Sequence, residues 1–218
     1  IADLERYIDV SRGEIVFARG ILLVEGEAEL YIIPAICKLI GKNLDELGIT
    51  VCSVHGTNFA PYIKFLGSKG LDKPFAVLTD NDPQTGKISL GIQRLISLLP
   101  LIGPNKGLKE MSPDEVKRLG QTHGLFLNDH TLEIDLFKCG QHKCICKTLI
   151  ELSDNGAAKK RATVWNDKPD QLDLDRFLKD IDEIGKGRFA QRLSSNISNV
   201  PYPSYIMSAI EYVSKKCR

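Results

Sequence analysis

The chain has 218 residues, of which 43% are hydrophobic and 26% are charged, with a formal net charge of +1. A chain of this length and apolar content can bury a core of its own, so we expect one sizeable α/β domain, or a domain with a smaller appendage. The balanced charge excludes a global field that attracts polyanions. Residues 1–139 carry −3 and residues 140–218 carry +4, which suits a metal site beside a phosphate-binding surface but is small enough to arise by chance.

The six cysteines do not form the pattern of a disulfide scaffold. Cys37 and Cys52 lie within apolar runs, which predicts reduced core residues of a cytoplasmic protein. No apolar run approaches the ~20 residues needed to span a bilayer, and no signal peptide is visible, so no membrane partner is expected. The chain begins with Ile1, which fits a fragment of a longer protein.

Strands and helices alternate in the front part of the chain. We expect, in order, an extended segment, a helix, a strand, a helix, a strand, a helix, a helix capped by Ser112, and a strand, over residues 14–26, 27–44, 49–56, 58–70, 74–80, 87–99, 112–124 and 124–128. This alternation predicts right-handed βαβ units and a parallel sheet covered on both faces. From Lys138 on the strand pattern is lost, and helices are expected over residues 141–156, 169–185, 186–197 and 203–216.

Acidic residues follow three of the apolar strands. Glu25 follows the first, Asp80 and Asp82 follow the third, and Asp129 comes just after the fourth. In a parallel sheet the carboxyl ends of the strands share one edge, where ligands bind. Carboxylates a few ångströms apart raise each other's pKa, and a divalent cation relieves the repulsion. Each acid alone is best explained as a solvated turn or first-turn residue, whereas all of them together predict a site for Mg²⁺ or Mn²⁺.

Several stretches resemble a known family. Val24-Glu25-Gly26 after a strand, with Asp80-x-Asp82 after a later strand, resembles the Toprim signature of type IA and II topoisomerases, bacterial primases and several nucleases. The stretches VEGEAE, VHGTNF, NDHTLEIDLF and GKGRFAQ, in this order, resemble the Toprim nuclease region of the OLD (overcoming lysogenization defect) family of ATP-dependent endonucleases. The resemblance spans nearly the whole chain. It implies an α/β fold with a Toprim-like parallel sheet, helices on both faces and a helical subdomain.

The resemblance also divides the chain into functional ranges. Residues 1–138 would be the Toprim α/β catalytic core, residues 139–185 a helical subdomain, and residues 186–218 a C-terminal segment with a catalytic lysine and closing helices. The implied activity is a metal-dependent DNA endonuclease that nicks or cuts by a two-metal mechanism. Little sequence specificity is expected, because no recognition helix is evident.

Residue roles follow from the same resemblance. Glu25, Asp80 and Lys186 would be catalytic, with Lys186 facing the scissile phosphate; a lysine near a helix start carries no such signal by itself. Two Mg²⁺ or Mn²⁺ ions are implied, with Ca²⁺ as an inhibitor, and two such ions clamp the attacking and leaving oxygens of an in-line displacement. Glu27 is expected to be solvated. The implied metal ligands are Glu25, Glu29, Asp80, Asp82, Glu133 and, as a further candidate, Asp129.

Basic residues of the rear half are candidates for contacts to DNA. A run over residues 159–161 is interpreted as a solvated loop that contacts the phosphate backbone in a salt-dependent and sequence-independent way. Arg188 would be a secondary phosphate contact beside the catalytic lysine. The full set of DNA-binding candidates is Lys186, Arg188, Lys159, Lys160 and Arg161.

Two cofactors are not expected. The stretch CGQHKCIC, residues 139–146, lacks the second ligand pair of a structural zinc site and is interpreted as helical. No G-x-x-x-x-G-K-[ST] motif occurs, so no ATP site is expected in this chain. OLD proteins look like a fusion of an N-terminal ABC-type ATPase to the Toprim region. The resemblance therefore implies DNA, that ATPase domain and a helicase as partners.

Two other functions place acids in a similar way. A phosphatase of the haloacid-dehalogenase type uses Asp-x-Asp after a strand, although on its first strand, whereas TDNDP here follows the third. A phospho-receiver or other regulatory module without enzymatic activity gathers acids and a lysine at one sheet edge. Receivers are near 120 residues long and have the acidic pair on strand one, which would leave the rear helices of this chain unexplained.

Overall fold

A computed structural model describes residues 13–103 and 107–217 of the chain. The described residues form two compact units, each assembled from separate stretches of sequence. Among the described residues, unit 1 takes residues 13–26, 43–103, 107–131 and 204–217, and unit 2 takes Glu27–Lys42 and Leu132–Pro203. The ranges 1–138, 139–185 and 186–218 expected from the sequence follow its motifs, whereas the two units follow the contacts between residues. As functional divisions, these three ranges stay a prediction.

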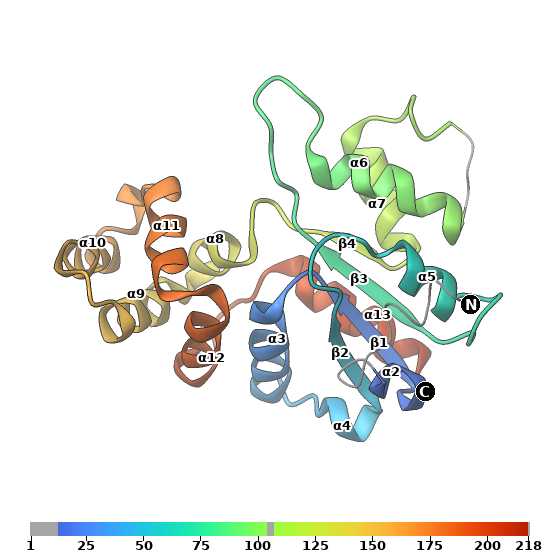
Figure 1. The fold of residues 1–218 in the computed structure, drawn as a ribbon, viewed down its shortest axis with the longest axis horizontal. Coiled ribbons are helices and arrows are strands. Elements are labelled where there is room, and N and C mark those ends of the chain that lie inside the picture. The colour runs from blue at the N-terminus through green and yellow to red at the C-terminus, as the bar shows by residue number, and fades with distance from the viewer. Residues whose placement is uncertain (1–12, 104–106, 218) are drawn as a thin grey trace. The chain divides into compact units, whose positions relative to one another are not determined.

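Unit 1 is built on a four-stranded parallel sheet with strand order β2-β1-β3-β4 (Figure 1). Every residue of β1 and β4 is buried, as expected for parallel strands with helices on both faces. The register places Leu22 of β1 opposite Val51 of β2 and Ala76 of β3. The strands are β1 (Gly20–Val24), β2 (Ile49–Ser53), β3 (Phe75–Thr79) and β4 (Leu125–Leu127).

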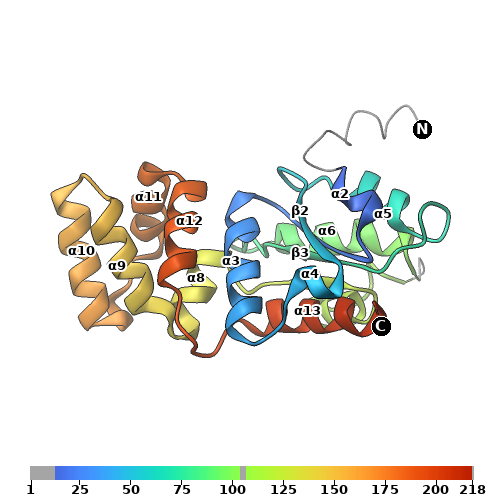
Figure 2. The same ribbon diagram turned by 90° about the horizontal axis from the view of Figure 1, so that it is seen from below.

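Helices cover both faces of this sheet, as predicted. One face packs against α13 (Ser204–Lys216), which contacts β1, β3 and β4 (Figure 2). The other face is buried against α5 (Ala60–Leu66), α6 (Leu90–Leu98) and α7 (Pro113–Thr122) in one apolar cluster. The remaining short elements of unit 1 are α2 (Glu14–Phe17), α4 (Leu44–Leu47) and the 3₁₀ turn η2 (Leu99–Leu101).

Two local expectations for unit 1 are wrong. The segment before β1 is not extended throughout, because Glu14–Phe17 forms a helical turn and the strand begins only at Gly20. The helix expected over residues 58–70 begins only at Ala60, with Phe59 at the N-cap position and without a side-chain cap hydrogen bond. The start of α7 is as predicted. Ser112 and Glu115 form a capping box in which each side chain accepts a hydrogen bond from the other's backbone N–H.

Unit 2 is helical in all its regular elements that the structure describes (Figure 2). Its helix α12 packs against α3 and α9, and α9 packs against α10. In its core the ring of Phe177 makes edge-to-face contacts with Phe137 at 5.4 Å and Trp165 at 6.0 Å between centroids. The elements are α3 (Glu27–Leu39), α8 (Leu132–Leu136), the π-helix η3 (Phe137–Gln141), α9 (His142–Leu152), α10 (Gly156–Asp167), the 3₁₀ turn η4 (Pro169–Gln171), α11 (Leu174–Ile184) and α12 (Lys186–Asn196).

None of the helices within residues 13–103 and 107–217 combines the length and the apolar character that a bilayer crossing requires.

Candidate functional site

Glu25 and Asp80 meet at the carboxyl edge of the sheet in unit 1. Glu25 directly follows β1 and Asp80 directly follows β3, and these two strands are neighbours. Oε1 of Glu25 accepts a hydrogen bond from the backbone N–H of Asp80 at 2.8 Å. The hydroxyl of Thr79, the last residue of β3, donates to the same oxygen. The backbone that ends β3 therefore holds the carboxylate of Glu25 at this edge.

A guanidinium group lies between these acids. Arg94 extends from α6, and its side chain is only 12% exposed. Its Nη1 donates to Oε1 of Glu25 at 2.9 Å and to the backbone oxygen of Asp80 at 3.0 Å, and also to the Thr79 hydroxyl. Its Nη2 donates to Oδ2 of Asp82 at 3.4 Å. Arg94 thus neutralises two carboxylates that come from different strand ends, and sequence analysis did not assign it to the site.

Asn128 fixes the carboxylate of Asp80. It is the residue directly after β4 and is 1% exposed. Its Nδ2 donates to Oδ1 of Asp80, and its Oδ1 accepts from the backbone N–H of Asn81 at 2.7 Å. Asp129, which the sequence proposed as a ligand, has a side chain that is 77% exposed and pairs with Lys117 at 2.7 Å. The side chain that β4 brings to Asp80 is therefore the amide of Asn128.

The segment that follows Asp80 is held tightly against the start of α6. Asn81 accepts a hydrogen bond from the hydroxyl of Ser89, the N-cap of α6, at 2.6 Å. A Cβ on Gly91 would lie 2.5 Å from the backbone oxygen of Asp80 and 2.8 Å from Cα of Asn81, so only glycine permits this approach. Asp82 has a φ of +47°, in the left-handed region that Asp adopts more readily than most residues. This close fit positions Arg94, one helical turn after Gly91.

The other predicted ligands and the predicted catalytic lysine belong to unit 2. Glu29 is half-buried in the first turn of α3, and Glu133 is 6% exposed in the first turn of α8. Lys186 is the first residue of α12 and is exposed, as is Arg188. Glu27 is exposed, as expected, and its carboxylate lies beside Gly187 of α12. Acidic and basic candidates thus occupy helix first turns in this unit.

The basic run over residues 159–161 is not in a loop. It lies within α10, so the loop interpretation is wrong. Lys159 and Lys160 are exposed. Arg161 is 27% exposed and donates from Nε at 2.8 Å and from Nη2 at 2.6 Å to the carboxylate of Asp180, whose side chain is 0% exposed. The guanidinium of Arg161 is therefore committed to a buried ion pair between α10 and α11.

Metal-binding side chains do not form a complete cage in the described residues. Within residues 13–103 and 107–217, no group of three or more His, Cys, Asp and Glu side chains is arranged to hold an ion. In the stretch CGQHKCIC, burial raises the pKa of the Cys139 thiol to about 11 and that of Cys146 to about 12. Zinc binds the thiolate form, so these raised pKa values oppose its coordination by Cys139 and Cys146.

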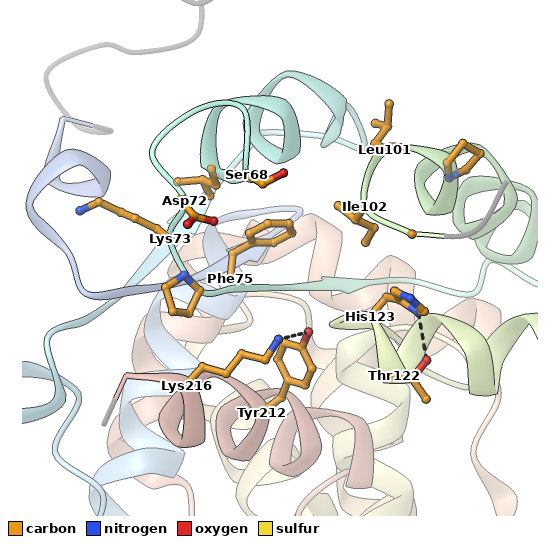
Figure 3. Close-up of a pocket in the computed structure, with 15 residues that line it drawn as sticks. Ser68, Asp72, Lys73, Phe75, Leu101, Ile102, Thr122, His123, Tyr212 and Lys216 are labelled. Carbon is orange, nitrogen blue, oxygen red and sulfur yellow. Dashed lines mark hydrogen bonds between the residues drawn. The ribbon is translucent and has the colours of Figure 1, made fainter.

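A separate cavity of about 530 Å³ lies at the opposite edge of the sheet in unit 1 (Figure 3). It borders Phe75, the first residue of β3, whereas Asp80 follows the end of that strand. The Nζ of Lys216 lies 4.1 Å from the centroid of the Tyr212 ring and donates to its hydroxyl at 2.7 Å. Lys216 and Tyr212 are thus paired with each other, and the cavity contributes none of the acids described above.

Comparisons with known proteins agree with this fold. The family described as "Overcoming lysogenization defect protein-like, TOPRIM domain" matches residues 16–82, which include Glu25, Asp80 and Asp82. The solved C-terminal region of the Burkholderia pseudomallei OLD protein is 43% identical, with a TM-score of 0.87, over 93% of this chain and 100% of that one. The chain belongs to the OLD family.

Two further relatives match this chain to different extents. The C-terminal region of the Xanthomonas campestris pv. campestris OLD protein is 42% identical, with a TM-score of 0.85, over 94% of this chain and 96% of that one. The Escherichia coli (strain K12) protein YbjD, itself uncharacterised, is 31% identical over 91 residues, which are 42% of this chain and 16% of YbjD. The chain therefore spans about a sixth of that curated relative.

Membership of the OLD family makes this chain a nuclease-type Toprim region, with the predicted parallel sheet and helical subdomain confirmed. The phosphatase and receiver alternatives belong to other families. Neither gains support from the described residues, since the Asp80-x-Asp82 pair follows β3, the third strand along the chain.

Proposed function

We propose that the chain is the catalytic region of a metal-dependent DNA endonuclease that hydrolyses phosphodiester bonds with little sequence specificity. The observation that carries this proposal is the meeting of Glu25, Asp80 and Asp82 at the carboxyl edge of the sheet, where Arg94 pairs with Glu25 and Asp82. Parallel sheets bind ligands at this edge, and the OLD-like Toprim match covers all three residues.

The side chains present at this edge suit a divalent cation. Toprim domains in general bind divalent metal ions, and carboxylate oxygens are the ligands that Mg²⁺ and Mn²⁺ prefer. The Arg94 guanidinium, which bridges Glu25 and Asp82, stands where a cation satisfies both charges. We assign Glu25, Asp80 and Asp82 as the ligands contributed by unit 1.

Glu29 and Glu133 complete the ligand set in this proposal, with Asp129 as a further candidate. Glu29 and Glu133 belong to unit 2, and in sequence they follow closely after the unit boundaries, which fall between Gly26 and Glu27 and between Thr131 and Leu132. A two-metal site takes about four or five carboxylates, which this set supplies. When bound, such ions activate water and neutralise charge on the phosphate oxygens. Ca²⁺ is expected to inhibit.

Lys186 serves in the proposal as the residue that stabilises negative charge on the scissile phosphate. It is exposed at the first position of an eleven-residue helix, α12, where backbone N–H groups favour an anion. Arg188, Lys159 and Lys160 are exposed and suit contacts to the sugar-phosphate backbone. Arg161 contributes less than the sequence predicted, because Asp180 engages its guanidinium.

The proposed partners extend beyond this chain. The chain corresponds to the C-terminal regions of OLD proteins, so we propose an N-terminal ABC-type ATPase domain in the full-length protein and a helicase as a further partner, in the cytoplasm. ATP is proposed to act on that domain and not on this region, since the chain contains no P-loop motif.

Nicking of supercoiled plasmid by the purified chain tests the proposal. We expect nicking with Mg²⁺ or Mn²⁺ and none with EDTA. Asp80→Ala and Lys186→Ala should each lower the rate at least about 100-fold, because each removes charge stabilisation at the phosphate. The matched control is Asp114→Ala, which removes an exposed acid from the first turn of α7. Nicking by Asp80→Ala at the parent rate would show that Asp80 is not a metal ligand.

A further inference from the structure

We propose that Arg94 is a built-in counter-cation of the acid cluster, and that a divalent ion displaces its guanidinium from Glu25 and Asp82. The inference rests on the proposed metal-dependent function and adds a residue that limits metal affinity. It starts from the fact that Arg94 bonds to two of the expected metal-ligand residues, through Oε1 of Glu25 and Oδ2 of Asp82.

In the metal-free protein, Arg94 balances the charge of the grouped carboxylates. The side chains of Arg94 and Glu25 are 12% and 17% exposed, so neither is fully hydrated. Grouped carboxylates shielded from water repel one another unless a cation pairs with them. Within the described residues, Arg94 is the cationic side chain with recorded hydrogen bonds to Glu25 and Asp82. It therefore stabilises the cluster when no metal is present.

The guanidinium of Arg94 and a divalent metal ion compete for the same carboxylates. A guanidinium and a metal ion that share the same carboxylate oxygens repel each other at short range. Oε1 of Glu25 already accepts from the Asp80 N–H and the Thr79 hydroxyl as well as from Arg94. A carboxylate oxygen has about two lone pairs. Metal coordination by that oxygen therefore requires at least one donor to leave, and the mobile donor is the long side chain of Arg94.

Helix α6 stays fixed when the side chain of Arg94 moves. The helix that carries Arg94 is anchored by the Ser89 cap and by the close approach of Gly91 to the backbone of Asp80. The Asp80 carbonyl, which accepts from Nη1 at 3.0 Å, is backbone and does not depend on the state of the carboxylates. Arg94 can thus release the two carboxylates and keep this bond, with no movement of α6.

The test measures metal-free stability and metal affinity together, so it does not depend on activity. Arg94→Gln should lower the unfolding temperature in EDTA and tighten Mn²⁺ binding by isothermal titration calorimetry. We expect the dissociation constant to fall about three- to tenfold, because hydrogen bonds to charged groups no longer have to break before the ion binds. The difference in unfolding temperature between Arg94→Gln and the parent should be smaller at saturating Mn²⁺ than in EDTA. Arg94→Lys should lie between Arg94→Gln and the parent in both measurements.

Arg118→Gln is the control, since it removes an exposed arginine from α7 in the same unit. It should leave both the Mn²⁺ affinity and the unfolding temperature nearly unchanged. Equal or weaker Mn²⁺ binding by Arg94→Gln would overturn the inference and make Arg94 a residue that merely orients Glu25. No Mn²⁺ binding by either the parent or Arg94→Gln would overturn the proposed metal dependence, and the displacement with it.

Discussion

Single residues at the carboxyl edge of the sheet are held by neutral donors as well as by charge. The Thr79 hydroxyl and the Asn128 amide each donate to one of the acids, and both side chains are buried. Neutral donors orient a carboxylate without adding a positive charge that repels an incoming ion. The site therefore combines Arg94, a cation that competes with a metal ion, with neutral donors that can remain in place.

Asn128→Ala should lower stability and nicking together. It removes the donor to Asp80 and leaves the backbone N–H of Asn81 without the acceptor that it has at 2.7 Å. A buried polar group that loses its partner costs about 1–3 kcal/mol. Urea unfolding should show this loss, and the plasmid assay a slower rate. Gln84→Ala, at an exposed position of the segment before α6, should change neither. Parent-like stability of Asn128→Ala would contradict the role given to this amide.

The capping box at the start of α7 makes the stability of the protein depend on pH in the acid range. Hydrogen bonds from Ser112 hold the pKa of Glu115 below its usual value. Because the folded pKa is lowered, this contribution is present above the unfolded pKa of 4.5 and is lost as the pH falls through the folded pKa. Glu115→Gln should thus be less stable than the parent at pH 7, with a difference that shrinks toward pH 3.

Thermal unfolding at a series of pH values measures this dependence. Ser112→Ala should cost about 1 kcal/mol at pH 7, the usual effect of losing an N-cap. Asp114→Gln, a neighbouring acid without a capping bond to Ser112, serves as the control. A gap between Glu115→Gln and the parent that stayed constant from pH 7 to pH 3 would be inconsistent with a titrating cap.

Two neighbouring basic residues of α10 are expected to have different roles. Arg161 pairs with Asp180 of α11, whereas Lys160 is exposed and is a candidate for contact with DNA. Arg161→Met should destabilise by about 2–4 kcal/mol, because it leaves the buried carboxylate of Asp180 with Arg176 alone, whose Nε lies 3.4 Å away. Lys160→Ala should leave stability unchanged, because Lys160 is exposed. Urea unfolding compares the two variants.

DNA affinity should be reduced more by Lys160→Ala than by Arg161→Met, the reverse of their effects on stability. If Lys160 contacts phosphate, Lys160→Ala should weaken binding uniformly across sequences and reduce the slope of log affinity against log salt by about 1. Fluorescence anisotropy with a labelled duplex at several salt concentrations gives this slope. An unchanged slope for Lys160→Ala would remove Lys160 from the proposed DNA-binding surface.

The sequence predicted which acids lie at the carboxyl edge of the sheet, because the topology of a parallel sheet alone places the strand ends there. Glu25 and Asp80 needed only the order of the elements to be expected at one edge. Arg94 could not be found in this way, since its position depends on how α6 docks through Gly91. Asn128 was accessible in principle, because it follows β4 directly, but the search for metal ligands favoured the acid beside it.

The sequence signals at helix ends were ambiguous for a local reason. Asn155 followed by Gly156 was interpreted as the end of a helix, yet the side chain of Asn155 accepts from the N–H groups of Ala157 and Ala158 and begins α10. Asn is favoured at both helix ends, as N-cap and as left-handed C-terminal residue. Packing between helices, which one sequence does not reveal, decides between the two.

The whole molecule joins early and late parts of the sequence within unit 1. Four residues of α13, namely Ile206, Ala209, Ile210 and Val213, are each 0% exposed, and this helix covers β1, β3 and β4. A chain that ends at Pro203 should therefore lose cooperative unfolding and bind a hydrophobic dye, because one face of the sheet is uncovered. Lys215→Ala, an exposed substitution on the same helix, should behave like the parent. A sharp thermal transition in the shortened chain would contradict this account.

The place of α13 in the sequence also affects how the protein is made. The strand β1 is translated before the other three strands, and Val213 and Cys217, which lie against its first residue, Gly20, are translated only after all four strands. Ribosomes add about 5–20 residues per second, so a nascent chain carries an uncovered apolar sheet for many seconds. Chaperone binding during that interval, and rapid completion of the last helix, should therefore decide how much of the newly made protein escapes aggregation.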